Sequence, residues 1–226
     1  MTVTENYELI KKRVAQACSR AGRDPEEIIV VGVTKTVQPG AIREAFHAGL
    51  RHFGENRVQE ALDKAAALAD IRSQYTFHMV GLIQSNKVSA AVKIFDYFQS
   101  VDSIKLAESI NQRAGRKVPV LLQVNITAET TKGGFSPGEL PAVLKKIFLL
   151  PNIGIEGFMT IAPLTTDPEL VRPVFRKLRE LRNAFGLNQL SMGMTDDFEV
   201  AIEEGATIVR IGRAIFGERQ NPLEKG

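Results

Sequence analysis

The sequence lacks features that several classes of protein need. It has one cysteine, Cys18, and no tryptophan among 226 residues. One cysteine cannot build an intrachain disulfide framework, so we predict a reducing, cytoplasmic location. No apolar run approaches the ~20 residues that a helix needs to cross a bilayer. The N-terminus is polar and has no apolar signal core, so we predict neither a signal peptide nor a membrane span.

Signatures of metal, nucleotide and nucleic-acid binding are also missing. The histidines His47, His52 and His78 do not have the spacing of metal ligands, so we expect no metal site. Phosphate-loop, dinucleotide-binding and nucleophile-elbow motifs are absent. The formal charge is only +3, and basic residues are interleaved with acidic ones. This balance argues against a nucleic-acid partner and fits a small anionic ligand.

What the chain does contain is an alternation of short β-branched runs with amphipathic stretches. At 226 residues it is long enough for one large domain and short for two, so we predict a single domain over residues 1–226. Several runs are continuously apolar, which is typical of parallel strands buried on both faces. The expected strands are Ile28–Val33, Leu50–Gly54, Tyr75–Gly81, Tyr97–Val101, Val118–Asn125, Ile153–Phe158, Gln189–Met192 and Thr207–Ile211.

Between these runs, capping residues, prolines and glycines indicate where helices begin and end. Ser136 has the sequence of an N-cap, followed by Pro137 at the first helical position and by Glu139 as a capping-box glutamate. Two further helices have comparable start and stop signals, namely Asp167-Pro168 with Gly186, and Asp196 to Glu199 with Gly205.

The number of units indicates the fold class. Eight strand–helix units in 226 residues average about 28 residues each, the size of a compact βα unit. An open doubly wound sheet usually has fewer strands, so the pattern favours a closed (β/α)8 barrel. The stretch from Thr4 to Gly22 predicts an extra helix before the first strand.

Functional residues of such barrels gather where strands end, because those loops share one face. Lys35 directly follows the first expected strand, and Glu55 and Asn56 follow the second. A lysine partly withdrawn from water loses its proton more easily, and its neutral amine can condense with an aldehyde. Position alone nevertheless favours a solvated loop lysine at residue 35. Asn56 suits a hydrogen bond to a ring hydroxyl or an imine, and equally suits a cap for the next helix.

Two glycine-containing segments follow the last two strands. Ser191-Met192-Gly193-Met194-Thr195 leads into a helix, and Arg210-Ile211-Gly212-Arg213 leads into a short turn. Glycines let backbone N–H groups approach an anion, and helix N-termini favour negative charge. Barrels often bind phosphate with these two loops. The alternative is that both glycines only ease tight turns.

For three other polar residues, a structural role is favoured over a functional one. His78 lies between apolar neighbours and is expected to be a core histidine with a satisfied ring. Lys87 and Lys132 lie in loops of the expected open face, where they could attract a second anion, but solvated surface lysines explain both.

The motifs resemble, in order and over nearly the whole chain, those of the pyridoxal phosphate homeostasis proteins. The matching segments are Val31-Gly32-Val33-Thr34-Lys35, His52-Phe53-Gly54-Glu55-Asn56, Phe77-His78-Met79-Val80-Gly81 with Gln84-Ser85-Asn86-Lys87, Gly157-Phe158-Met159-Thr160, Ser191 to Asp197, and Val209-Arg210-Ile211-Gly212. Phe77 stands where the family often has tryptophan, and Thr195 stands where it usually has serine. Neither departure removes a needed group.

The resemblance implies a monomeric barrel related to the N-terminal domain of alanine racemase. It implies pyridoxal 5′-phosphate (PLP) held as a Schiff base on Lys35, with Asn56 near the imine and Arg210 facing the pyridine nitrogen. It also implies that Thr195 binds the phosphate.

By the same resemblance, the backbone of Gly212 and Arg213 completes the phosphate site. The implied role is PLP homeostasis without established catalytic turnover, with apo-enzymes that use PLP as candidate recipients.

The sequence leaves two alternative functions. A PLP-dependent amino-acid racemase or decarboxylase needs a second acid/base group from a further β-domain and a dimer partner, and only fifteen residues follow Ile211. An unrelated phosphate-binding barrel enzyme, with Lys35 as an ordinary surface residue, would form no coloured adduct with PLP.

Overall fold

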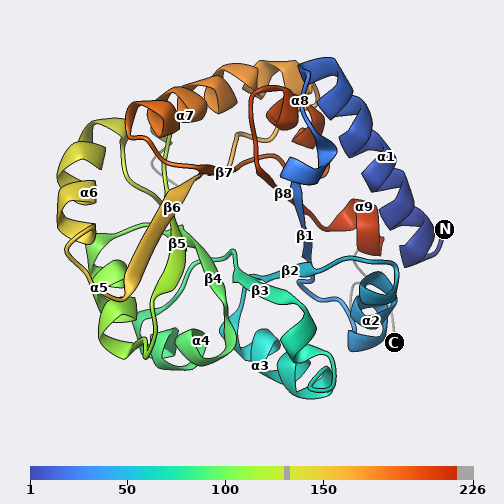
Figure 1. The fold of residues 1–226 in the computed structure, drawn as a ribbon, viewed down its shortest axis with the longest axis horizontal. Helices are drawn as coiled ribbons and strands as arrows, with labels where there is room; N and C mark the ends of the chain where they lie inside the picture. The colour runs from blue at the N-terminus through green and yellow to red at the C-terminus, as the bar shows by residue number, and fades with distance from the viewer. Residues whose placement is uncertain (130–132, 218–226) are drawn as a thin grey trace.

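The computed structural model describes residues 1–129 and 133–217 (Figure 1). Parallel strands close into a barrel in chain order, with β1 paired to both β2 and β8. The strands are β1 (Ile29–Val33), β2 (His52–Glu55), β3 (Thr76–Met79), β4 (Tyr97–Val101), β5 (Val118–Gln123), β6 (Ile153–Met159), β7 (Gln189–Ser191) and β8 (Ile208–Ile211). All eight predicted strands are confirmed, with ends that shift by up to two residues, and the (β/α)8 class is confirmed with them.

Helices surround this barrel as an outer ring (Figure 1). They are α1 (Val3–Ala21), α2 (Pro39–His47), α3 (Val58–Ala67), α4 (Val88–Ile94), α5 (Ile104–Arg113), α6 (Leu140–Ile147), α7 (Arg172–Ala184), α8 (Phe198–Glu203) and α9 (Arg213–Phe216). None of the helices in the described ranges is long and apolar enough to cross a membrane.

The predicted extra helix is α1, which packs on α8 and α9 outside the barrel (Figure 1). Thr2 and Glu5 form a capping box at its start, and Gly22 ends it in the left-handed conformation at φ 64°. Ion pairs Arg13–Glu199 and Arg20–Glu203 join α1 to α8.

Two predicted helix starts are confirmed, although each begins as a 3-10 turn. The Glu139 carboxylate accepts from the Ser136 backbone N–H at 2.8 Å, as a capping box requires. The Asp167 side chain accepts from the Glu169 N–H at 3.0 Å. The third predicted start, within Asp196 to Glu199, is confirmed in position because α8 begins at Phe198, but the predicted cap is wrong: the Asp197 side chain accepts from the Met194 N–H at 2.6 Å instead of capping the helix.

The inside of the barrel is apolar in one layer and polar in the next. Inward side chains from five strands form a buried apolar cluster of Val31, Tyr97, Leu121, Met159 and Ile208. Strand side chains alternate between faces, so residues two positions further along point inward as well. These include Gln99, Gln123 and Arg210, all buried. The barrel is therefore closed below and polar toward the carboxyl ends of its strands.

One close approach between strands gives a stability prediction. A Cβ on Gly157 of β6 would lie 1.9 Å from the carbonyl oxygen of Gln189, its partner on β7. Gly157→Ala therefore cannot be accommodated without separating the strands, and we expect the free energy of unfolding to fall by about 3 kcal/mol. Denaturant unfolding measures this. Gly154→Ala on the same strand is the control, because the nearest atom to a Cβ on Gly154 would be Cε of Lys117, at 3.4 Å. Equal midpoints for the two variants would contradict the prediction.

Candidate functional site

Lys35 lies in the turn that follows β1, at the mouth of the barrel, with its side chain half-buried. Along β1, alternation makes Ile29, Val31 and Val33 the inward positions, and Lys35 follows Val33 by two residues, in the turn beyond the end of the strand. The next residue, Thr36, has φ 64°. Because left-handed backbone is a genuine outlier for a β-branched residue, the turn holds local strain that its surroundings must support.

Arg210 reaches the same mouth from β8, the strand beside β1. It is paired in register with Val31 and is buried. Its guanidinium donates to the Ser191 hydroxyl and, at 2.8 Å, to the carbonyl oxygen of Thr160. Burial lowers the pKa of Arg210 to about 10, with the Asp197 carboxylate acting in the opposite direction. The guanidinium therefore remains a fixed positive charge at neutral pH.

A buried hydrogen-bond chain continues from Arg210 across the barrel. The Ser191 hydroxyl donates to Gln99 at 2.7 Å, and the Gln99 amide bonds Nδ1 of His78 at 2.9 Å. The other nitrogen of His78 bonds His52 at 3.0 Å. Burial, followed by the charge on His52, lowers the pKa of His78 to about 3, so its ring is neutral. The satisfied core histidine predicted at this position is confirmed.

No motif singles out Gln99. The signal that finds it is its place on the inner face of β4, two residues beyond the apolar layer at Tyr97. Through Ser191, Gln99 fixes the direction in which Arg210 can point.

The loop after β7 admits only glycine at residue 193. Gly193 has φ 88°, and a Cβ there would lie 2.6 Å from the Ala201 Cβ and 2.8 Å from the Phe198 Cα. The tight turn brings Thr195, which is half-exposed, to the start of α8. Within the described ranges, the backbone N–H of Thr195 donates to no other protein group.

The loop after β8 lies beside it. Gly212 occupies the N-cap position of α9, and its N–H likewise makes no bond to another part of the described chain. The exposed Arg213 guanidinium donates to both carboxylate oxygens of Asp196, at 2.7 and 2.9 Å, and so ties the two loops together. Backbone donors at neighbouring helix starts are a favourable place for an anion.

Asn56 follows β2 and is half-buried. The alternative role considered for it, capping the next helix, is wrong: Arg57 occupies the N-cap position of α3, which has no side-chain cap. An added Cβ on Gly81 would lie 2.4 Å from the Asn56 carbonyl oxygen, so the loop after β3 packs tightly on this residue.

The remaining candidates are less central. Lys87 is exposed in a 3-10 turn, Ser85–Lys87, and Lys132 lies outside the described residues. In the part of the chain that the structure describes, no three or more His, Cys, Asp or Glu residues are grouped to hold a metal ion.

The donor set fits an aldehyde that also has a phosphate group. Lys35 supplies an amine, Arg210 a fixed cation, and the last two loops supply backbone N–H groups for an anion. The glycine at residue 193 lets the loop after β7 pack closely on Phe198 and Ala201 of α8. Fold and candidate site together define the class: a (β/α)8 barrel that has, at one mouth, a lysine, a buried arginine and two loops with backbone N–H groups unbonded within the described residues.

Comparison with known proteins places the chain in a family. Residues 5–220 match the model of the alanine racemase N-terminal domain. The pyridoxal phosphate homeostasis protein of Aquifex aeolicus is 44% identical over 97% of this chain and 100% of its own length. The chain belongs to the pyridoxal phosphate homeostasis protein family, within the wider group that contains the alanine racemase N-terminal domain.

Solved structures agree with this fold. PipY of Synechococcus elongatus, in a structure with PLP bound, is 39% identical with a TM-score of 0.81, covering 92% of this chain and 100% of PipY. Alanine racemase of Corynebacterium glutamicum has a TM-score of 0.72 at 17% identity, covering 99% of this chain and 63% of the racemase. The latter likeness shows a shared barrel only.

Proposed function

We propose that this chain binds PLP and serves its homeostasis, holding the cofactor as a Schiff base on Lys35 rather than acting as a classical enzyme. The observation that carries the proposal is the placement of Lys35, in the turn after β1, and of Arg210, on the adjoining strand β8, at the mouth where the loops after β7 and β8 also lie. Family membership and the PLP-bound relative support the choice of ligand.

Each residue has a distinct task in this proposal. The neutral Lys35 amine would condense with the aldehyde carbon, whose oxygen leaves as water, and Asn56 would offer an amide beside it. Arg210, held by Ser191 and the Thr160 carbonyl, would face the ring nitrogen. Thr195, with the backbone of Gly212 and Arg213, would bind the phosphate.

Arg210 also supports the carrier role. When bound, PLP supplies an electron sink whose strength depends on a protonated ring nitrogen. A guanidinium has no proton acceptor to offer and no negative charge to stabilise that proton, so Arg210 keeps the ring nitrogen unprotonated. The chain would thus retain the cofactor while activating bound amino acids weakly.

The direct test is an absorption spectrum of the purified protein before and after PLP, followed by borohydride reduction and mass mapping. We expect a visible band and a reduced adduct on Lys35. No band would favour an unrelated phosphate-binding barrel.

The enzyme alternative is retained because the fold is shared with alanine racemase. Exchange of the α-proton of an amino acid in D₂O, followed by NMR, separates the two functions. We expect no exchange above the rate of free PLP, and rapid exchange would favour racemase or decarboxylase chemistry. The monomeric state, the cytoplasmic location and apo-enzymes as PLP recipients stay predictions.

Thr195→Ala tests the phosphate loops. Loss of a hydroxyl hydrogen bond to a charged phosphate should weaken PLP binding about 10-fold. Pyridoxal without phosphate should bind the variant and the wild type equally, because it makes no such bond. Titration with both ligands measures this. An equal loss for both would place Thr195 away from the phosphate.

A further inference from the structure

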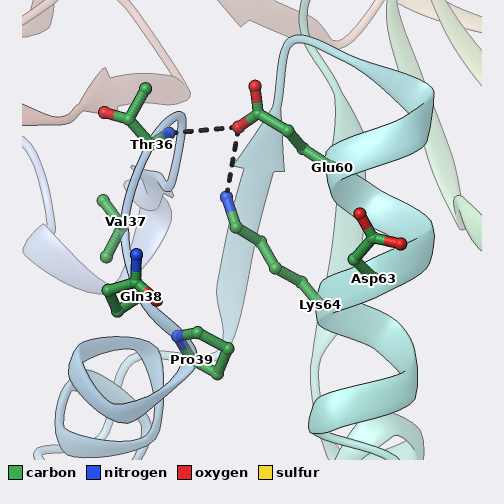
Figure 2. A pocket seen from close by; sticks show the side chains of 7 residues that line it. All are labelled: Thr36, Val37, Gln38, Pro39, Glu60, Asp63 and Lys64. Carbon is green, nitrogen blue, oxygen red and sulfur yellow. Dashed lines mark hydrogen bonds and ion pairs between the residues drawn. The ribbon is translucent and has the colours of Figure 1, made fainter. Parts of the chain in front are cut away.

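The turn that contains Lys35 is tied to helix α3 on both sides. Before it, the Thr34 carbonyl oxygen accepts from Nζ of Lys64 at 2.6 Å. After it, the Thr36 N–H donates to the Glu60 carboxylate at 3.1 Å. Figure 2 shows the Glu60 carboxylate between Thr36 and Lys64, with dashed lines from it to the Thr36 N–H and to the Lys64 amine. The backbone on either side of Lys35 is therefore held by two residues one helical turn apart.

A third residue extends this connection to Asn56. The Glu55 carboxylate, fully buried, pairs with Lys64 and accepts from the Thr34 hydroxyl at 2.8 Å. Its second oxygen accepts from the Asn56 N–H at 3.2 Å. We call Glu55, Glu60 and Lys64 the α3 anchor. It fixes the backbone of the two loops that supply Lys35 and Asn56.

Lys64 is suited to this task and unsuited to attaching a ligand itself. Its side chain is only 9% exposed. A lysine ammonium has three donors, and here the acceptors are Thr34, Glu55 and, at 3.5 Å, Glu60. The amine is saturated within the protein, so its structural role is to hold the acceptors in place.

On its outer side, the turn that contains Lys35 is not held by packed side chains. A cavity of about 330 Å³ lies against the turn, lined by Thr36 to Pro39 and by Glu60, Asp63 and Lys64 (Figure 2). A strained Thr36 beside open space would relax into it if the polar contacts were removed. Buried ion pairs often add little net stability, whereas they can specify one arrangement.

We propose that Lys64, with Glu55 and Glu60, is a positioning residue that aims Lys35 at the barrel mouth. The inference rests on the proposed function of Lys35 and deepens it. Misplacement of a reacting group by about 1 Å can cost roughly 100-fold in rate, so an anchor of this kind can control adduct formation.

Two variants test it. Lys64→Met/Glu55→Gln removes both buried charges together, so that neither is left unpaired. Glu60→Ala removes the acceptor of the Thr36 N–H, together with the longer ion pairs of Glu60 to Lys64 and Arg57, at a residue with a 26% exposed side chain. In both, the borohydride-trapped PLP adduct on Lys35 should form about 10-fold or more slowly. In the PLP-free proteins, hydrogen exchange over residues 33–38 should accelerate.

Glu204→Gln is the matched control. Glu204 is equally buried and paired with arginines of α7, but it precedes β8 at the opposite face of the barrel. The Glu204→Gln variant should be less stable than the wild type, but its rate of adduct formation on Lys35 and its hydrogen exchange over residues 33–38 should not change. No adduct in the wild type would overturn the proposed function and this inference with it. A normal wild-type adduct that forms at an unchanged rate in both folded variants would overturn the inference alone.

Discussion

Lys35→Ala is expected to leave no borohydride-trappable PLP adduct in a protein that remains folded. The amine is the group that attaches to the aldehyde, and alanine offers no nucleophile there. Residual binding of PLP through its phosphate should persist at lower affinity, because the proposed phosphate loops follow β7 and β8 and do not include residue 35. The visible band should disappear, and mass mapping after reduction should find no modified lysine.

The variant should be close to wild type in stability. Lys35 is half-buried in a turn, and substitutions away from the core usually change unfolding free energy by less than about 0.5 kcal/mol. Lys87→Ala, at an exposed lysine of the loop after β3, is the control and should keep the adduct. An adduct of undiminished yield in Lys35→Ala would reject the assignment of Lys35.

The fold was predictable because both of its signals are local. Parallel strands buried on both faces produce continuous apolar runs, and helix starts display caps, so units can be counted along the chain. The prediction of a side-chain cap for α8 failed, because the side chain concerned can bond more than one backbone N–H. Asp197 has the sequence of a capping residue but bonds Met194 upstream, because the turn at Gly193 brings that N–H within reach.

The site was predictable only in part, for a geometric reason. Lys35 and Thr195 lie in the loops that follow β1 and β7, so the barrel alone places them at the mouth. The partners of Arg210 depend on which strands face each other across the closed barrel. Gln99 precedes Ser191 by 92 positions, and no local pattern reports that bond.

Glu55 shows the same limit. It lies among the polar residues at the end of β2, yet alternation turns it outward to Lys64 while Asn56 remains near the mouth. A shift of one position along the chain therefore decides whether a residue joins the α3 anchor or stays among the candidates for the site.

Arg210→Glu is expected to weaken PLP binding about 100-fold and to change the absorption spectrum. The carboxylate would face the Thr160 carbonyl and Asp197, two groups that now interact favourably with the guanidinium. A negative charge near the ring nitrogen would favour its protonation, which alters the electronic state of the ring. Spectra and PLP titration of the purified variant measure both effects.

A buried carboxylate can also destabilise the barrel, so Arg210→Gln separates charge from folding. Glutamine can still bond the Ser191 hydroxyl, while the positive charge is lost. We expect a folded protein with intermediate affinity and a smaller spectral change. Arg43→Gln is the control. Arg43 lies on α2 and pairs with Asp70, which follows α3, so this substitution removes an exposed positive charge outside the barrel. If both Arg210 variants kept the wild-type spectrum and affinity, Arg210 would not contact the ring, and weak activation of amino acids would need another cause.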